Sequence, residues 1–109
     1  MAIQKAGALQ FRDLFEVVGA GAFTIDMANA ATGLGTFAVS QVSVPGAALG
    51  DLVLVAPAVD VVDAAVVGNV TAAGLVDIVL LNNTAGAVNL ASCAYTVVVL
   101  RLNPAYNVV

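Results

Sequence analysis

The sequence of 109 residues contains no histidine and no tryptophan, and it has a single cysteine, Cys93. Histidine is the commonest general base and metal ligand at neutral pH, so its absence argues against most hydrolytic and zinc-dependent chemistry. One cysteine cannot form a disulfide within the chain, and without a histidine partner it lacks the usual activation of a catalytic thiol. We therefore expect no enzymatic activity and no cofactor, and we interpret Cys93 as a small apolar residue in a strand.

Charged residues are also few, at 9% of the chain against roughly a quarter in typical soluble domains. The three basic residues, Lys5, Arg12 and Arg101, are scattered along the sequence, and the net charge is −4. Nucleic-acid binding needs clustered cations that face phosphate groups. We therefore expect no nucleic-acid partner.

The acidic residues do not form a recognisable metal-binding loop. Asp60 and Asp63 lie close in sequence and could approach Asp51 or Asp77, but no Asp-x-Asp-x-Asp calcium loop is present. Isolated aspartates at the ends of strands usually form turns. The sequence therefore predicts no metal site.

The mean hydropathy of the chain is high, at +1.05, because alanine and valine are by far its commonest residues. A membrane-spanning helix requires about 20 consecutive, mainly apolar residues. The longest apolar run, residues 52–59, is interrupted by Pro57 and followed by Asp60. Arg12 and Asp13 also come too early for a secretory signal peptide. We therefore expect no membrane partner.

The first 21 residues differ in composition from the rest, and we interpret them as an N-terminal arm. Residues 1–18 hold four of the ten charges, and their apolar positions fit both helical and alternating periodicity. Gly19-Ala20-Gly21 is expected to be a flexible joint, followed by a β domain at residues 22–109 with a short C-terminal tail. The large and charged side chains of the arm are candidates for contacts with a partner or a neighbouring subunit: Ile3, Leu9, Phe11, Arg12, Leu14 and Phe15.

From residue 23 onward, short β-branched stretches alternate with turn residues about every ten positions, which is typical of an all-β fold. Residues 45–51 should form a fixed turn, residues 71–74 should close a hairpin, and residues 82–86 should form a further turn. Ser40-Gln41 should carry a bulge where the apolar face switches. The pattern predicts an antiparallel β-sandwich or a small, jelly-roll-like β-barrel. Strands are expected at residues 23–27, 36–44, 52–56, 59–62, 65–70, 75–81 and 94–102.

Several of these expected strands are apolar on both faces, notably at residues 52–55 and 97–100. An antiparallel sheet normally presents one face to water, and a chain of this length has little further material to cover the other face. A monomer of this size exposes about 5,500 Å², so its ten charges are sparse for a free surface. We therefore expect copies of the chain to associate with one another in a ring.

Two segments resemble a known family. VPGAALGDLVLV at residues 44–55 and NNTAGAVNLAS at residues 82–92 resemble segments of small proteins encoded among tailed-phage and prophage virion genes, of the capsid decoration (cement) type. The valine-rich strand at the end of the chain also matches. Ala85 and Asn89 stand where that pattern has glycine and aspartate, and residues 67–77 keep only its outline.

The resemblance implies a structural virion protein that decorates and stabilises the capsid shell. It further implies a homotrimer, made in the cytoplasm of the bacterial host and attached to the capsid surface, whose arm contacts the major capsid protein. Because many copies attach to one shell, a weak contact made by each copy is then sufficient to hold the proteins on the capsid.

Two other interpretations stay open. One is a module of a phage head or tail fibre that binds a host receptor. Such a binder should display tyrosine, tryptophan or arginine anchors on loops, whereas the only tyrosines here are Tyr95, in an expected strand, and Tyr106, in the tail. The other is a bacterial surface or pilus-like subunit, against which the missing signal sequence argues.

Overall fold

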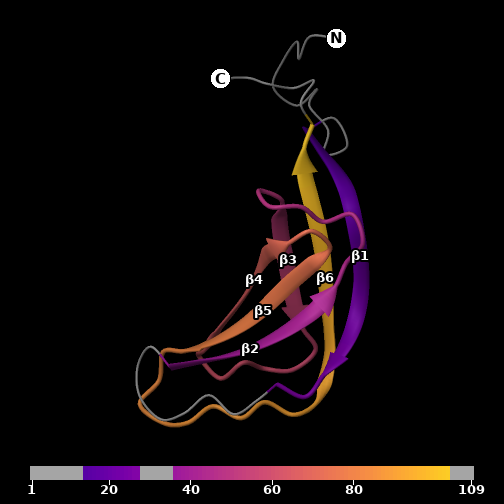
Figure 1. Ribbon diagram of the computed structural model, residues 1–109. Coiled ribbons are helices and arrows are strands. Elements are labelled where there is room, and N and C mark those ends of the chain that lie inside the picture. Colours follow the sequence, from indigo (N-terminus) through magenta and orange to yellow (C-terminus); the bar gives the residue numbers. More distant parts are fainter. Residues whose placement is uncertain (1–13, 28–35, 104–109) are drawn as a thin grey trace, which may run out of the picture.

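The computed structural model describes residues 14–27 and 36–103, which form two antiparallel three-stranded sheets packed face to face (Figure 1). One sheet has the strand order β1-β6-β3 and the other β2-β5-β4, and among the described residues no ladder joins the two into a barrel. The predicted all-β antiparallel sandwich is therefore confirmed. The strands are β1 (Phe15–Ile25), β2 (Thr36–Ser43), β3 (Leu52–Pro57), β4 (Ala65–Ala72), β5 (Leu75–Asn82) and β6 (Cys93–Leu102).

The core lies between the sheets and is built from alternate residues of their strands. Successive side chains of a strand point to opposite faces of its sheet, and in β5 the residues Val76, Ile78 and Leu80 are all fully buried. Tyr95 and Val97 of β6 are equally inaccessible. Since β5 and β6 are the central strands of their sheets, their inward side chains form the middle of the sandwich.

The two sheets approach closely where β4 faces β3. A Cβ atom added at Gly68 of β4 would lie 2.4 Å from Cγ1 of Val53 and 2.7 Å from Cγ2 of Val55. No side chain fits in that space, because real non-bonded carbon atoms stay more than 3 Å apart. Glycine at this position therefore lets the backbone of β4 lie directly on the side chains of β3.

Two local predictions are wrong. The pairing of β2 with β5 runs without a register shift, so the expected bulge at Ser40-Gln41 is absent. Residues 59–62 form a loop rather than a strand, because the Asp60 carboxylate accepts a hydrogen bond from the backbone N–H of Val62 (3.0 Å). That local bond closes a turn, and Val62 and Asp63 adopt positive φ angles of 54° and 66°.

β1 begins earlier than expected and changes the interpretation of the arm. It starts at Phe15 and runs without interruption through Gly19-Ala20-Gly21, pairing with β6 along its length. The boundary between an arm and a β domain therefore does not fall at Gly21. The expected flexible joint is instead a bulge between Val17 and Gly19. A Cβ at Gly19 would lie 2.7 Å from Cγ1 of Val44, so close packing explains this glycine.

The hairpin predicted between residues 65–70 and 75–81 is confirmed as β4 and β5, joined by the turn at Ala73-Gly74. Gly74 has a φ of 74°, which a glycine adopts without strain. Its backbone also ties the hairpin to the segment before β3, since the Gly74 N–H donates to the carbonyl of Ala47 (2.8 Å) and its carbonyl accepts from Val44 (2.9 Å).

Candidate functional site

The outer face of the sheet β1-β6-β3 carries no charged side chain within the described residues. The registers of both strand pairs and the alternation of each strand define which side chains point outward. We call this surface the charge-free face. It consists of Phe15, Val17, Ala20, Ala22 and Thr24 of β1, Leu52, Leu54 and Ala56 of β3, and Ala94, Thr96, Val98, Leu100 and Leu102 of β6.

Four large apolar side chains on this face are open to solvent in the isolated chain, whereas Leu100 of β6 is buried. Val17, Leu52, Leu54 and Leu102 are each more than half exposed. Single exposed apolar residues are ordinary on protein surfaces, but contiguous patches mark sites of interaction. The charge-free face is therefore the main candidate for a functional surface.

The outer face of the other sheet has a different composition. Phe37, Val39 and Val67 are exposed there, but a polar row crosses the three strands at Gln41, Asp77 and Asn69. The Gln41 side-chain amide donates a hydrogen bond to the Asp77 carboxylate (3.0 Å). We call this surface the mixed face. It consists of Phe37, Val39, Gln41 and Ser43 of β2, Ala65, Val67 and Asn69 of β4, and Leu75, Asp77, Val79 and Leu81 of β5.

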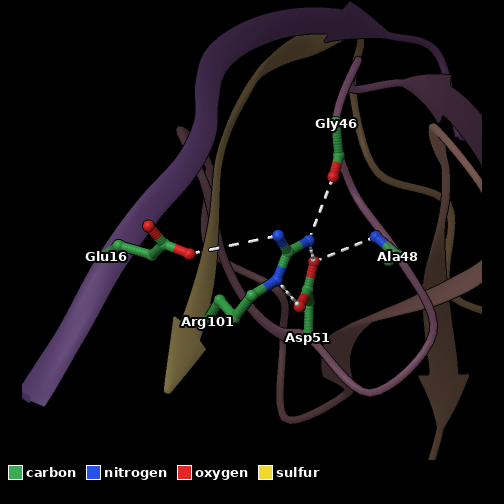
Figure 2. Close-up of polar contacts among 5 residues, drawn as sticks. All are labelled: Glu16, Gly46, Ala48, Asp51 and Arg101. Atoms are coloured by element: carbon green, nitrogen blue, oxygen red, sulfur yellow. Dashed lines mark hydrogen bonds and ion pairs between the residues drawn. The ribbon is translucent and has the colours of Figure 1, made fainter. Parts of the chain in front are cut away.

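A cluster of polar contacts fixes the loop between β2 and β3 against the end of β6 (Figure 2). The Asp51 carboxylate accepts two hydrogen bonds from the Arg101 guanidinium, from Nε and Nη2, at 2.8 Å each. It accepts a third from the backbone N–H of Ala48 (2.9 Å). Arg101 Nη2 also donates to the Gly46 carbonyl (3.1 Å), and Glu16 on β1 lies 4.0 Å from Nη1. One arginine thus connects β6, β1 and the loop.

The charges of this cluster shift one another's protonation. The hydrogen bonds from Arg101, and the one from Ala48, hold the pKa of Asp51 below its ordinary value, although burial acts in the opposite direction. The same pair raises the pKa of Arg101 further above its usual range. The Asp51 side chain is only 4% exposed, and every one of these donors belongs to the protein itself, so we interpret the cluster as structural.

The loop itself has the geometry of a fixed turn, as the sequence indicated. Gly46 and Gly50 take φ angles of 94° and 96°, which favour glycine. Backbone bonds run from the N–H of Ala47 to the carbonyl of Val44 and from that of Asp51 to the carbonyl of Ala48, at 3.1 Å each. Sequence reasoning missed the partnership of Asp51 with Arg101. The available signal was a lone cation in an otherwise apolar strand.

The second segment that carries the family resemblance also closes on itself. Asn82 is fully buried, and its side-chain amide donates to the Gly86 carbonyl (2.7 Å) while its Oδ1 accepts from the backbone N–H of Thr84 (2.8 Å). This confirms the predicted turn cluster at residues 82–86. Its polar groups are used within the turn.

Two of the six candidate contact residues lie within the described part of the chain. Leu14 and Phe15 are half-buried at the start of β1, where the Leu14 carbonyl accepts a hydrogen bond from the backbone N–H of Asn103 (2.7 Å). Phe15 therefore belongs to the charge-free face at the edge of the sheet β1-β6-β3, whereas Leu14 directly precedes β1. The remaining four, together with the expected C-terminal tail at residues 104–109, lie outside the described residues: Ile3, Leu9, Phe11 and Arg12.

Reactive side chains are dispersed in the described ranges. No three acidic, cysteine or histidine side chains in residues 14–27 and 36–103 come together as a metal site. Tyr95 has a buried hydroxyl without a hydrogen-bond partner in that part of the chain, and burial, with a smaller effect of the neighbouring Cys93 thiol, raises its pKa. None of the described segments is a helix long and apolar enough to cross a membrane.

Comparison with known proteins adds no assignment. No protein-family model matches the sequence, and neither the curated proteins nor the solved structures give a match.

Proposed function

We propose that this chain is a structural protein of a tailed-phage virion that decorates and stabilises the capsid shell as a homotrimeric cement protein. The observation that carries the proposal is the charge-free face, on which four large apolar side chains are more than half exposed. A contiguous apolar surface of this kind favours a partner that covers it, and a subunit of an assembly has such a partner permanently.

The two segments that resemble decoration proteins support a scaffold role. Residues 44–51 are held by the Asp51–Arg101 pair, and residues 82–86 by the Asn82 side chain. Both turns use their polar groups to stabilise the fold, which suits a rigid body that many copies present on a shell. In this proposal the chain has no catalytic activity, and its partners are the major capsid protein and other copies of itself.

The receptor-binding fibre module receives less support. Tyr95 is fully buried in the sandwich and cannot serve as an exposed anchor. Exposed side chains of the described loops include Leu49 and Val62, which are apolar and lack the hydrogen-bonding groups that give a receptor binder its specificity.

Copy number in purified virions tests the proposal. We expect quantitative mass spectrometry to find the chain at hundreds of copies per particle, in proportion to the major capsid protein. A few copies per particle would support the fibre module instead, and absence from the particles would contradict any virion role.

The expected contact of the N-terminal segment with the capsid is tested by truncation. Removing residues 1–13 leaves β1 intact, whereas a longer deletion would remove Phe15 and its neighbours from the sheet. We expect the shortened protein to keep its oligomeric state. When it is added to capsid shells from which the decoration protein is absent, it should occupy fewer sites than the full chain does. Equal occupancy would show that the capsid contact lies elsewhere.

A further inference from the structure

We infer that three copies of this chain join through the charge-free face, with β6 of each copy facing a common three-fold axis. This inference deepens the proposed homotrimer and rests on it for the number of copies. It assigns the surface between subunits to one sheet and leaves the mixed face directed away from the axis.

Charge is the first argument for a second copy as the partner. Thr24 and Thr96 are the only polar side chains among the thirteen residues of the charge-free face. A partner that presented charges to this surface would lose their hydration without gaining a counter-charge, which is costly. The mixed face of a neighbouring copy carries Asp77 and is a poor fit, whereas the charge-free face of another copy matches.

The area of the face is the second argument. The strands β1, β6 and β3 have eleven, ten and six residues. With a rise of about 3.4 Å per residue and a spacing of about 4.8 Å between strands, the flat area is on the order of 400 Å². Relief of the side chains increases the accessible area beyond this figure. A stable interface buries about 800 Å² per partner, so this face provides a large part of what one copy needs.

The width of the sheet favours three copies. Three sheets, each about 14 Å wide, form a closed triangular prism when each lies about 4 Å from the axis. Sheets that pack face to face are about 10 Å apart, so side chains fill about 5 Å on each side. The two distances nearly agree, and a three-stranded sheet is therefore close to the width at which three copies enclose a filled core.

Side-chain sizes at the edges of the sheet fit the same arrangement. In a three-fold prism, β3 of one copy lies beside β1 of the next. Leu54 and Ala20 both lie in register with Val98 of β6, so they stand at the same height on opposite edges of the face. At each corner the large Leu54 of one copy therefore meets the small Ala20 of its neighbour, which allows close packing.

Sedimentation of the full chain at micromolar concentration tests the assignment. We expect the unchanged protein to sediment as three copies and Leu54→Lys as one, a threefold fall in mass, because the prism would have to bury three unpaired charges. Val67→Lys is the matched control. Val67 is also an outward residue of a strand, 53% exposed against 57% for Leu54, but it lies on the mixed face. We expect this variant to remain a trimer.

A cysteine pair tests the corner directly and does not depend on the folding of the lysine variant. Ala20 and Leu54 of one copy are separated by β6, so their Cα atoms are about 10 Å apart, beyond the reach of about 7 Å for a disulfide. Mild oxidation of Ala20→Cys/Leu54→Cys should therefore link copies and give covalent trimers. Each single-cysteine variant shows how much cross-linking arises from the native Cys93. The pair Val39→Cys/Val67→Cys flanks Val79 on the mixed face and should give no covalent trimers.

Several outcomes overturn the inference. They are a monomeric unchanged protein, a two-copy particle, a Leu54→Lys variant that remains a trimer, and cross-linking at the mixed face in place of the charge-free face. If residues 1–13 of the same copy cover the charge-free face, the unchanged protein sediments as a monomer, which is one of these outcomes. The virion role is tested separately by copy number, so either proposal can fail while the other stands.

Discussion

The outer faces of the two sheets differ although the strands beneath them are alike. Both sheets have three antiparallel strands, valine-rich sequences and tightly packed inner faces. The charge-free face continues this apolar character outward, with Leu52 and Leu54 exposed on β3. The mixed face interrupts it with Gln41, Asp77 and Asn69. Mean hydropathy alone therefore does not describe this chain, because the positions of the few polar residues decide how each sheet face interacts with water.

A single polar row is enough to make a face compatible with water. The Gln41–Asp77 hydrogen bond lies on the mixed face, and burying the acidic side chain of Asp77 without a compensating partner would be unfavourable. The charge-free face has no such group. We therefore expect the two faces to respond differently to the same kind of substitution.

The largest expected effect is at Gly68, where the two sheets touch. Gly68→Ala places a Cβ 2.4 Å from a methyl carbon of Val53, so the sheets must separate or the side chains must leave their rotamers. We expect a loss of about 1–3 kcal/mol in the free energy of unfolding, measured by denaturant titration. Gly86→Ala is the control, because a Cβ there meets nothing within 4 Å. Equal stability of the two variants would contradict the close contact of β3 and β4.

A second substitution removes the difference between the faces. Gln41→Val/Asp77→Val replaces two members of the polar row on the mixed face with valine. The sandwich then has apolar surfaces on opposite sides, which favours open stacking in place of a closed assembly. We expect light scattering to show particles that grow beyond the size of the unchanged protein with increasing concentration. Leu54→Val, a conservative change on the charge-free face, should leave the particle size unchanged. Unaltered size of the double variant would mean that the polar row has no role in limiting association.

A smaller effect concerns pH and the Asp51–Arg101 pair. The pKa of Asp51 is lowered in the folded protein from an ordinary value of 3.8, so its contribution to stability is complete above about pH 4 and is lost as the pH falls through the lowered folded value. Thermal unfolding should show Asp51→Asn to be less stable than the unchanged protein at pH 7, with a difference that narrows in acid. Asp77→Asn controls for the loss of one negative charge. A difference that stays constant down to pH 2 would contradict the ion pair.

The smallest expected effect is at Tyr95. Its hydroxyl is buried and makes no hydrogen bond within the described residues, so Tyr95→Phe removes a polar group that contributes little. We expect the free energy of unfolding to change by less than about 1 kcal/mol, in denaturant titrations run beside Ile78→Ala. The latter empties a fully buried site and should cost about 2–5 kcal/mol. A large loss in Tyr95→Phe would reveal a hydrogen-bond partner.

Local sequence patterns predict most of the strands, because the alternation of apolar residues within each strand matches the faces that the fold buries, and turn residues stand where the chain reverses. The hairpin of β4 and β5 is an example, since Gly74 provides the turn and β-branched residues provide the strands. β1 was shortened in the prediction because Gly19 and Gly21 weaken any local strand signal. Its pairing with β6 joins residues 68 to 87 positions apart, from Ile25↔Cys93 to Phe15↔Leu102, and stabilises it. No local window contains that information.

The candidate site was predictable in kind but not in place. Two-faced apolar strands at residues 52–55 and 97–100 indicated a surface that needs a partner. The sequence could not show that Leu52 and Leu54 point outward beside β6, nor that Gln41, Asn69 and Asp77 meet in one row, because both facts depend on the registers between strands. For the same reason Asp51 and Arg101, fifty residues apart, could not be paired from the sequence.

The position of β6 in the middle of its sheet has a consequence for the order of events during synthesis. β2, β5 and β4 are complete once residue 82 has been made, whereas β1 and β3 have no neighbour in their own sheet until β6 emerges. Until then the ribosome carries two unpaired strands, Arg101 has not yet reached Asp51, and the charge-free face does not exist as a surface. In the proposed trimer, a nascent chain therefore could not join its neighbours through this face before β6 is in place. Assembly through this face would then be restricted to subunits whose sandwich is closed.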